Sequence, residues 1–172
     1  DADDLLAEMA ETAKRMASEL GKINDLSESE KSSLFKQVGY GALKYFLLKV
    51  SPQKSMMFDP VASVDFIGNT GPFIQFNFVR AKSVLRKCLD EGIPTTIDSV
   101  DPNAWDESEL RIIQQPLQWP EIVQSAAAQY DPSVIANHSY ELTKAYSRWY
   151  QDHSVLKEPN EAKCAARIAL TH

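Results

Sequence analysis

The centre of the chain carries the stretch that decides the fold, GNTGPFIQFNFVRAKSVLRK at residues 68–87. Its first five residues are turn formers, and Pro72 has the fixed backbone angle that suits the first position of a helix. Three phenylalanines and four basic residues follow, with no acidic residue as far as Leu89, and Gly92 marks an end. The stretch therefore predicts a loop that leads into an aromatic and basic helix.

This helix has two interpretations. In the first, the phenylalanine rings pack into the protein while the cations face water. In the second, nucleic-acid bases stack on the rings while the cations neutralise phosphates, which is the chemistry that a single strand requires. The loop before the helix offers backbone N–H groups where an anion can dock, although the same pattern also serves as a plain connection. The residue pattern alone does not decide between a structural role and nucleic-acid binding, either for the helix or for the loop.

Helical periodicity extends outward from this stretch, and the alternation typical of strands is nearly absent. Apolar residues at three-and-four spacing predict a helix over residues 4–20. Capping boxes predict two further helix starts, at Ser27-x-x-Glu30 and Asp106-x-x-Glu109. Other helix boundaries are predicted at Asp59-Pro60, Pro116, Trp119-Pro120, Asp131-Pro132 and Asn160. We therefore expect an all-α helical bundle of six to eight helices with short links.

Two features of these helices call for a neighbouring element. Gly39 and Gly41 interrupt the helix that follows Ser27, which costs stability unless another backbone or a ligand approaches closely there. Residues 161–172 form an apolar-faced helix that reaches Thr171-His172 without a cap. That ending predicts a further covering element, and hence a chain truncated at its C-terminus.

Composition and charge exclude several classes of protein. The 172 residues are 44% hydrophobic and 24% charged, which is typical of a soluble globular protein and not of a collagenous or disordered one. No apolar run approaches the ~20 residues that span a bilayer, and the acidic start is not that of a signal peptide. The net charge of −6 hides a basic middle, because residues 36–90 hold eight basic and three acidic side chains. We therefore expect a cytoplasmic protein in which nucleic acid is not excluded as a partner.

Metal and disulfide chemistry find little support in the sequence. Cys88 and Cys164 lie far apart and without a Cys-x-x-Cys partner, so we expect both to be reduced. The three histidines, His138, His153 and His172, are scattered. Structural zinc needs four closely spaced thiolate or imidazole ligands, so no metal site is predicted.

Several blocks of sequence, taken in order, resemble one family. They are VGYGALKY (38–45), FDP (58–60), DFIGNTGPFIQF (65–76), VLRK (84–87), WPEIV (119–123), WYQD (149–152) and AARIAL (165–170). Together they resemble the arginyl-tRNA synthetases just past the catalytic core, and they cover nearly the whole chain. The resemblance implies that residues 1–35 are a linking region after that core. It also implies that residues 36–172 are the helical anticodon-binding domain.

The same resemblance implies which residues bind tRNA. In this family the helix after the turn carries two aromatic residues and an arginine that face the anticodon loop, and these correspond to Phe73, Phe76 and Arg80. Asn69 in the preceding loop and Lys87 further along the helix complete the expected tRNA-binding set. Phenylalanine replaces the tyrosine often found at the first two positions, which keeps the stacking face and loses a hydroxyl. His138 also departs from the family pattern and is assigned no role.

The motifs for catalysis are absent from the sequence. Class I synthetases bind ATP through a His-x-Gly-His signature and a Lys-Met-Ser-Lys-like loop, and neither is present. We therefore expect no catalytic residue and no cofactor in this chain. The resemblance implies arginine-tRNA ligase activity, with ATP and magnesium, only for the full-length enzyme. It implies the tRNA for arginine as the partner, no DNA or membrane partner, and a monomer.

Two alternatives stay open beside the resemblance. The bundle could be a protein-interaction module whose last helix docks on a partner. It could also be the anticodon domain of a related class I synthetase, such as the one for cysteine, although the GNTGPF block argues against this. Binding of tRNA that falls steeply with salt would separate an RNA-binding domain from a protein-binding one.

Overall fold

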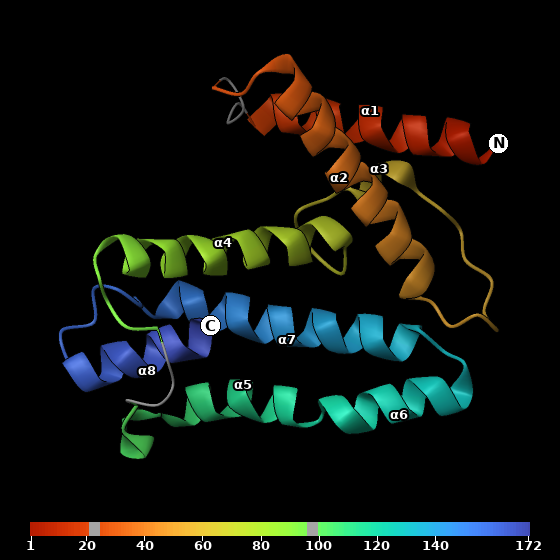
Figure 1. Cartoon of the computed structure of the whole chain (residues 1–172). Coiled ribbons are helices and arrows are strands. Elements are labelled where there is room, and N and C mark those ends of the chain that lie inside the picture. Colours follow the sequence, from red (N-terminus) through yellow and green to blue (C-terminus); the bar gives the residue numbers. More distant parts are fainter. Residues whose placement is uncertain (21–24, 96–99) are drawn as a thin grey trace. The chain divides into compact units, whose positions relative to one another are not determined.

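The computed structural model describes residues 1–20, 25–95 and 100–172, and every regular element in these ranges is helical (Figure 1). The elements are α1 (Ala2–Leu20), α2 (Glu28–Leu48), α3 (Pro60–Ser63), α4 (Gly71–Asp90), the 3₁₀-helix η2 (Pro102–Ala104), α5 (Glu107–Leu117), α6 (Trp119–Gln129), α7 (Ser133–Asp152) and α8 (Glu161–Thr171). The predicted all-α fold is therefore confirmed. The helix predicted over residues 4–20 corresponds to α1, and Gly21, the glycine that predicts its end, lies outside the described residues.

Local side chains start the helices at the predicted places. Ser27 and Glu30 form a reciprocal capping box at α2, in which the Ser27 N–H donates to the Glu30 carboxylate at 2.8 Å. The Asp59 carboxylate accepts the first free N–H groups of α3, and the Asn160 side chain accepts the Lys163 N–H at 3.0 Å to start α8. These bonds satisfy donors that a helix cannot satisfy internally.

The predicted stop at Pro116 is wrong, because α5 continues to Leu117 with the proline inside its last turn. A proline lacks the N–H that would donate backward, yet the turn around it can still close through other groups. Here the Gln118 N–H donates to the Gln115 carbonyl at 3.1 Å. The helix therefore ends one residue after the proline and not before it.

The chain divides into two compact units. Unit 1 comprises Asp1–Phe76 with Ser125–Asn137, and unit 2 comprises Asn77–Gln124 with His138–His172. Helices α4, α6 and α7 each contribute residues to both units. These units are defined by contacts within the chain. The predicted division into a linking region, residues 1–35, and an anticodon-binding domain, residues 36–172, stays a prediction.

Unit 1 is built on the crossing of α1 and α2 (Figure 1). Its buried core is apolar and consists of Met9, Ala13, Ala42, Leu43 and Val64. At the crossing a Cβ on Gly39 would lie 2.5 Å from the backbone carbonyl oxygen of Met9. Where α4 begins, a Cβ on Gly71 would lie 2.8 Å from the backbone carbonyl oxygen of Gly41. The close backbone approach predicted at Gly39 and Gly41 is thus confirmed.

Unit 2 has its own apolar core. The buried members come from α4, α5, α7, α8 and the segment before α8, and are Val84, Leu85, Cys88, Ile112, Trp149, Val155 and Ile168. The Trp149 ring stacks on His153 with the ring centres 5.4 Å apart. Both cysteines are free, as predicted, and Cys88 is fully buried.

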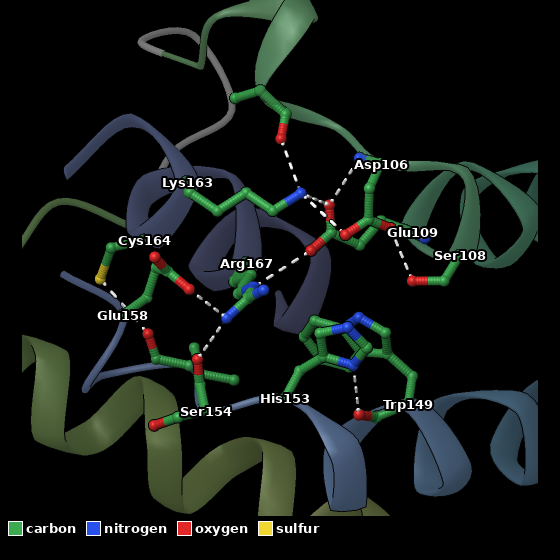
Figure 2. Close-up of polar contacts among 12 residues, drawn as sticks. Asp106, Ser108, Glu109, Trp149, His153, Ser154, Glu158, Lys163, Cys164 and Arg167 are labelled. Atoms are coloured by element: carbon green, nitrogen blue, oxygen red, sulfur yellow. Dashed lines mark hydrogen bonds and ion pairs between the residues drawn. The ribbon is translucent and has the colours of Figure 1, made fainter. Parts of the chain in front are cut away.

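Unit 2 also holds a set of five charged residues, which we call the ion cluster: Asp106, Glu109, Glu158, Lys163 and Arg167 (Figure 2). Glu109 is completely buried at its centre. Its carboxylate accepts from the Lys163 ammonium at 2.6 Å and from the Arg167 Nε at 3.1 Å. It also accepts the Asp106 N–H at 2.9 Å and so completes the capping box of α5. One side chain therefore starts α5 and ties it to α8.

Candidate nucleic-acid interface

The predicted tRNA-binding residues of α4 share one side of that helix. Phe73, Phe76, Arg80 and Lys87 are spaced by three, four and seven residues, and such spacings return to the same face every one or two turns. The helix has no acidic residue before its last position, Asp90. Phe73 and Phe76 belong to unit 1, and the two cations belong to unit 2.

Within unit 1 the two phenylalanines differ in exposure. Phe76 is 47% exposed, and its ring meets the ring of Phe66 edge to face with the ring centres 6.4 Å apart. Phe73 is half-buried, and its backbone N–H donates to the Thr70 hydroxyl at 3.2 Å. Close to half of Phe76 is therefore accessible to solvent. The interpretation in which all three phenylalanine rings of α4 pack inward is therefore wrong.

The loop before α4 is held in a defined conformation. The Asp65 side chain accepts the Ile67 N–H at 2.9 Å, and the Thr70 hydroxyl donates to the Asp65 carbonyl at 2.5 Å. Gly68 has a φ of +85°, in the left-handed region that favours glycine. Ile67, between these anchors, is 79% exposed.

Asn69 is engaged within the protein. Its side-chain oxygen accepts from the Tyr45 hydroxyl at 2.5 Å, and its backbone carbonyl accepts from the Lys49 ammonium at 2.7 Å. Burial lowers the pKa of Lys49 from its ordinary value. The role expected of Asn69 toward tRNA stays a prediction, and these contacts favour a role in shaping the loop.

Within unit 2, Arg80 is partly buried and oriented by two neighbours. Its guanidinium lies over the Tyr150 ring at 5.0 Å and donates to the Asn77 side-chain oxygen at 3.0 Å. The planar guanidinium of arginine carries five N–H donors and suits contacts with phosphate or a base edge. Lys87 is exposed near the end of α4. The Tyr150 partner comes from α7, and no motif near Arg80 in the sequence predicts it.

Another exposed ring, that of Phe78, lies in unit 2 and was not part of the predicted tRNA-binding set. Phe78 is 61% exposed, and the Lys82 ammonium lies over it at 5.5 Å. The signal was the buried stripe of α4, which runs through Asn77, Val84 and Cys88 at helical spacing and leaves Phe78 off its line. Phe78 follows Phe76 by two residues, so the two rings leave the helix on different sides.

The described residues were compared with the ligand groupings that a metal ion requires. In the ranges that the structure covers, no three or more His, Cys, Asp or Glu side chains are grouped so as to hold a metal ion. The acidic side chains of the ion cluster are already satisfied by Lys163 and Arg167. No described helix has the length and apolar character that crossing a membrane would require.

An all-α fold with aromatic rings and cations on the accessible side of one helix has the features of a helical RNA-binding domain. Comparison with known families narrows the class: the family model described as the DALR anticodon binding domain matches residues 74–172. The chain belongs to this family. The family resemblance drawn from the sequence is confirmed.

Relatives with similar sequences are arginine-tRNA ligases. The chain is 46% identical over 171 residues to the enzyme of Flavobacterium psychrophilum, covering 99% of this chain and 28% of that protein. It is 47% identical over 173 residues to that of Bacteroides fragilis, covering 99% of this chain and 29% of that protein. The chain thus spans less than a third of the length of these curated relatives.

Solved structures agree with the fold. The arginyl-tRNA synthetase of Thermus thermophilus superposes with a TM-score of 0.84 at 24% identity, over 99% of this chain and 28% of that one. The Plasmodium falciparum arginyl-tRNA synthetase gives 0.79 at 22% identity, over 98% of this chain and 30% of that one. At these identities the likeness establishes a shared fold.

Proposed function

We propose that this chain is the anticodon-recognising part of an arginine-tRNA ligase. Membership of the anticodon-binding family and the identity to arginine-tRNA ligases support the proposal. The observation that carries it is the exposed ring of Phe76 on a helix that has basic residues and no acidic residue before Asp90. Stacking surfaces combined with cations suit an anticodon loop, whose bases can unstack from one another.

In this proposal the residues of α4 divide the work of recognition. Phe76, with Phe73 one turn earlier, offers ring faces on which unstacked bases lie. Arg80 contacts phosphate or a base edge with a guanidinium that Tyr150 and Asn77 already orient, so less side-chain freedom is lost on binding. Lys87 neutralises a phosphate, a contact that positions the strand without reading its sequence.

The intact enzyme would attach arginine to its tRNA with ATP and magnesium, and this chain would supply specificity and no catalytic residue. Its partner would be the tRNA for arginine, its compartment the cytoplasm, and its own state a monomer. ATP supplies the energy that activates arginine, and that chemistry would belong to a part of the enzyme outside these 172 residues.

Titration with the tRNA for arginine tests the proposal. Phe76→Ala should weaken binding by about 5- to 150-fold, the loss expected for one stacked base, about 1–3 kcal/mol. Because Phe76 is half exposed, thermal stability should change little. Leu89→Ala is the matched control, since Leu89 is a 71% exposed apolar residue of the same helix with no proposed contact.

Salt dependence and a second tRNA complete the test. Affinity should fall steeply as salt rises, because cations that bind phosphate release counterions. A tRNA with a swapped anticodon should bind more weakly than the tRNA for arginine. Equal binding by Phe76→Ala and wild type, together with a large loss of stability, would show that the ring is structural. A chain that ignores tRNA altogether would favour a protein-interaction module.

A further inference from the structure

A polar network in unit 1 ties the loop before α4 to two helices. It joins Tyr45 of α2, Lys49 at the C-cap of that helix, Asn69 of the loop and Asn137 of α7. All four side chains are half-buried, where a hydrogen bond is screened less by water than it is at the surface. None of the four belongs to the apolar core of the unit.

Tyr45 makes the shortest bond of this network. Its hydroxyl lies 2.5 Å from the Asn69 side-chain oxygen and 3.1 Å from the Ala136 carbonyl oxygen. A hydroxyl has one proton to donate, and the shorter distance directs it to Asn69. The hydroxyl of Tyr45 therefore fixes the rotamer of the Asn69 side chain.

The remaining groups hold Asn69 and its surroundings from other directions. The Lys49 ammonium donates to the Asn69 backbone carbonyl at 2.7 Å, and the Asn69 amide donates to Asn137 at 3.4 Å. Asn137 in turn donates to the Lys49 carbonyl at 3.0 Å and to the Ser133 carbonyl at 2.8 Å. Asn69 is thus restrained at both its backbone and its side chain.

The loop that Asn69 belongs to borders the stacking residue. The ring of Phe66, which belongs to this loop, meets the ring of Phe76 edge to face. The next residue of the loop, Ile67, is 79% exposed. Thr70, next to Asn69, accepts the first bond of α4 from Phe73. A change in the rotamer or position of Asn69 would therefore act on the surroundings of both phenylalanines.

We propose that Tyr45 is a positioning residue for anticodon recognition: its hydroxyl, through Asn69, holds the loop 65–70 in the conformation that receives the RNA. This inference rests on the proposed function and assigns Tyr45 no contact with RNA. A loop ordered before binding spares the RNA the cost of ordering it. When only a fraction of molecules has the competent loop, the apparent dissociation constant rises by the inverse of that fraction.

The test uses the whole 172-residue chain and a variant that lacks only the Tyr45 hydroxyl. Tyr45→Phe removes the hydroxyl and leaves the ring, and we expect the tRNA for arginine to bind about 5- to 10-fold more weakly at 25 °C. Tyr40→Phe is the matched control, because it removes a hydroxyl from the same helix and should leave affinity unchanged. Circular dichroism should show the same helix content for both variants.

A double-mutant cycle identifies the route. If Tyr45 acts through Asn69, its effect on affinity should shrink at least threefold in an Asn69→Ala background, where the bond from the hydroxyl to the Asn69 side chain is gone. Equal effects in both backgrounds would overturn the route through Asn69. A lower melting temperature with unchanged affinity for Tyr45→Phe would show that the network is only structural.

The outcomes also separate this inference from the proposed function. Should Phe76→Ala weaken tRNA binding while Tyr45→Phe does not, the positioning role fails and anticodon recognition stands. Should neither variant nor the anticodon swap alter binding, the proposed function fails, and the positioning role fails with it.

Discussion

Different kinds of contact stabilise unit 1 and unit 2, each within itself. In unit 1, α1 and α2 approach so closely that Gly39 has no room for a side chain, and the polar contacts around Asn69 involve mainly hydroxyl, amide and carbonyl groups. In unit 2, the buried carboxylate of Glu109 joins two cations from α8. Backbone contact depends on shape and tolerates changes of pH, whereas a buried charge depends on its partners.

The largest loss of stability is expected from a substitution in unit 2. Glu109→Ala should lower the free energy of unfolding by about 3–5 kcal/mol, because Lys163 and Arg167 lose a fully buried partner and α5 loses part of its cap. Glu107→Ala, in the same turn, is the control, since Glu107 is 82% exposed in its pair with Arg111 and should cost at most about 1 kcal/mol. Urea unfolding followed by circular dichroism measures both. Similar costs for the two variants would contradict the importance of burial.

A smaller effect is expected from a methyl group at the helix crossing of unit 1. Gly39→Ala should cost about 1–3 kcal/mol, because its Cβ would lie 2.5 Å from a backbone oxygen that cannot move without shifting α1. Gly41→Ala is the matched control on the same helix. Its Cβ would meet the end of the flexible Gln75 side chain, which can move away. Equal melting temperatures for Gly39→Ala and wild type would show that the crossing is loose.

The smallest expected effect is a dependence on pH that belongs to unit 2. Burial acts to raise the pKa of Asp106, but hydrogen bonds from Ser108, Lys163 and a backbone N–H outweigh it and hold this pKa well below its ordinary value. A depressed pKa contributes stability above the unfolded value of about 3.9, and that stability is lost as pH falls below it. Because Asp106 is partly exposed, the loss should be smaller than that caused by Glu109→Ala.

Thermal unfolding between pH 2.5 and 5 measures this dependence. Asp106→Asn keeps a capping oxygen and has no carboxylate to titrate, so its melting temperature should vary less with pH than that of the wild type. Parallel curves for the two proteins would locate the acid sensitivity elsewhere.

At alkaline pH the titrating group of the ion cluster is Lys163. Burial acts to lower the pKa of Lys163, but its bonds to Glu109 and Asp106 outweigh burial and raise this pKa overall. The stability that Lys163 contributes is therefore lost as the pH rises above about 10.5.

Sequence reasoning succeeded where the deciding residues are close together in the chain. The capping box of Ser27 and Glu30 spans three positions, and the helix starts at Asp59 and Asn160 depend on neighbours equally near. The glycines of α2 also predicted a close approach, because glycine in a helix is costly without one. The element that approaches, α1, could not be named from the sequence.

The rest depended on residues that only folding brings together. Glu109 was recognised as a cap, but its burial against Lys163 and Arg167 requires α8, far along the chain. The contact of Arg80 with Tyr150 likewise joins two helices. For the candidate interface, the sequence provided the aromatic and basic helix and the family resemblance, while Asn69 came from the resemblance without any sign of its bond to Tyr45.

Glu109 both caps α5 and pairs with two cations of α8, and this affects how the protein folds during synthesis. During synthesis its carboxylate can cap α5 as soon as that helix emerges from the ribosome, but its cationic partners on α8 are translated more than fifty residues later. Until then the nascent chain must keep this charge in water, so the surrounding apolar side chains cannot close over it. Unit 2 should therefore complete its folding only after Arg167 has left the exit tunnel.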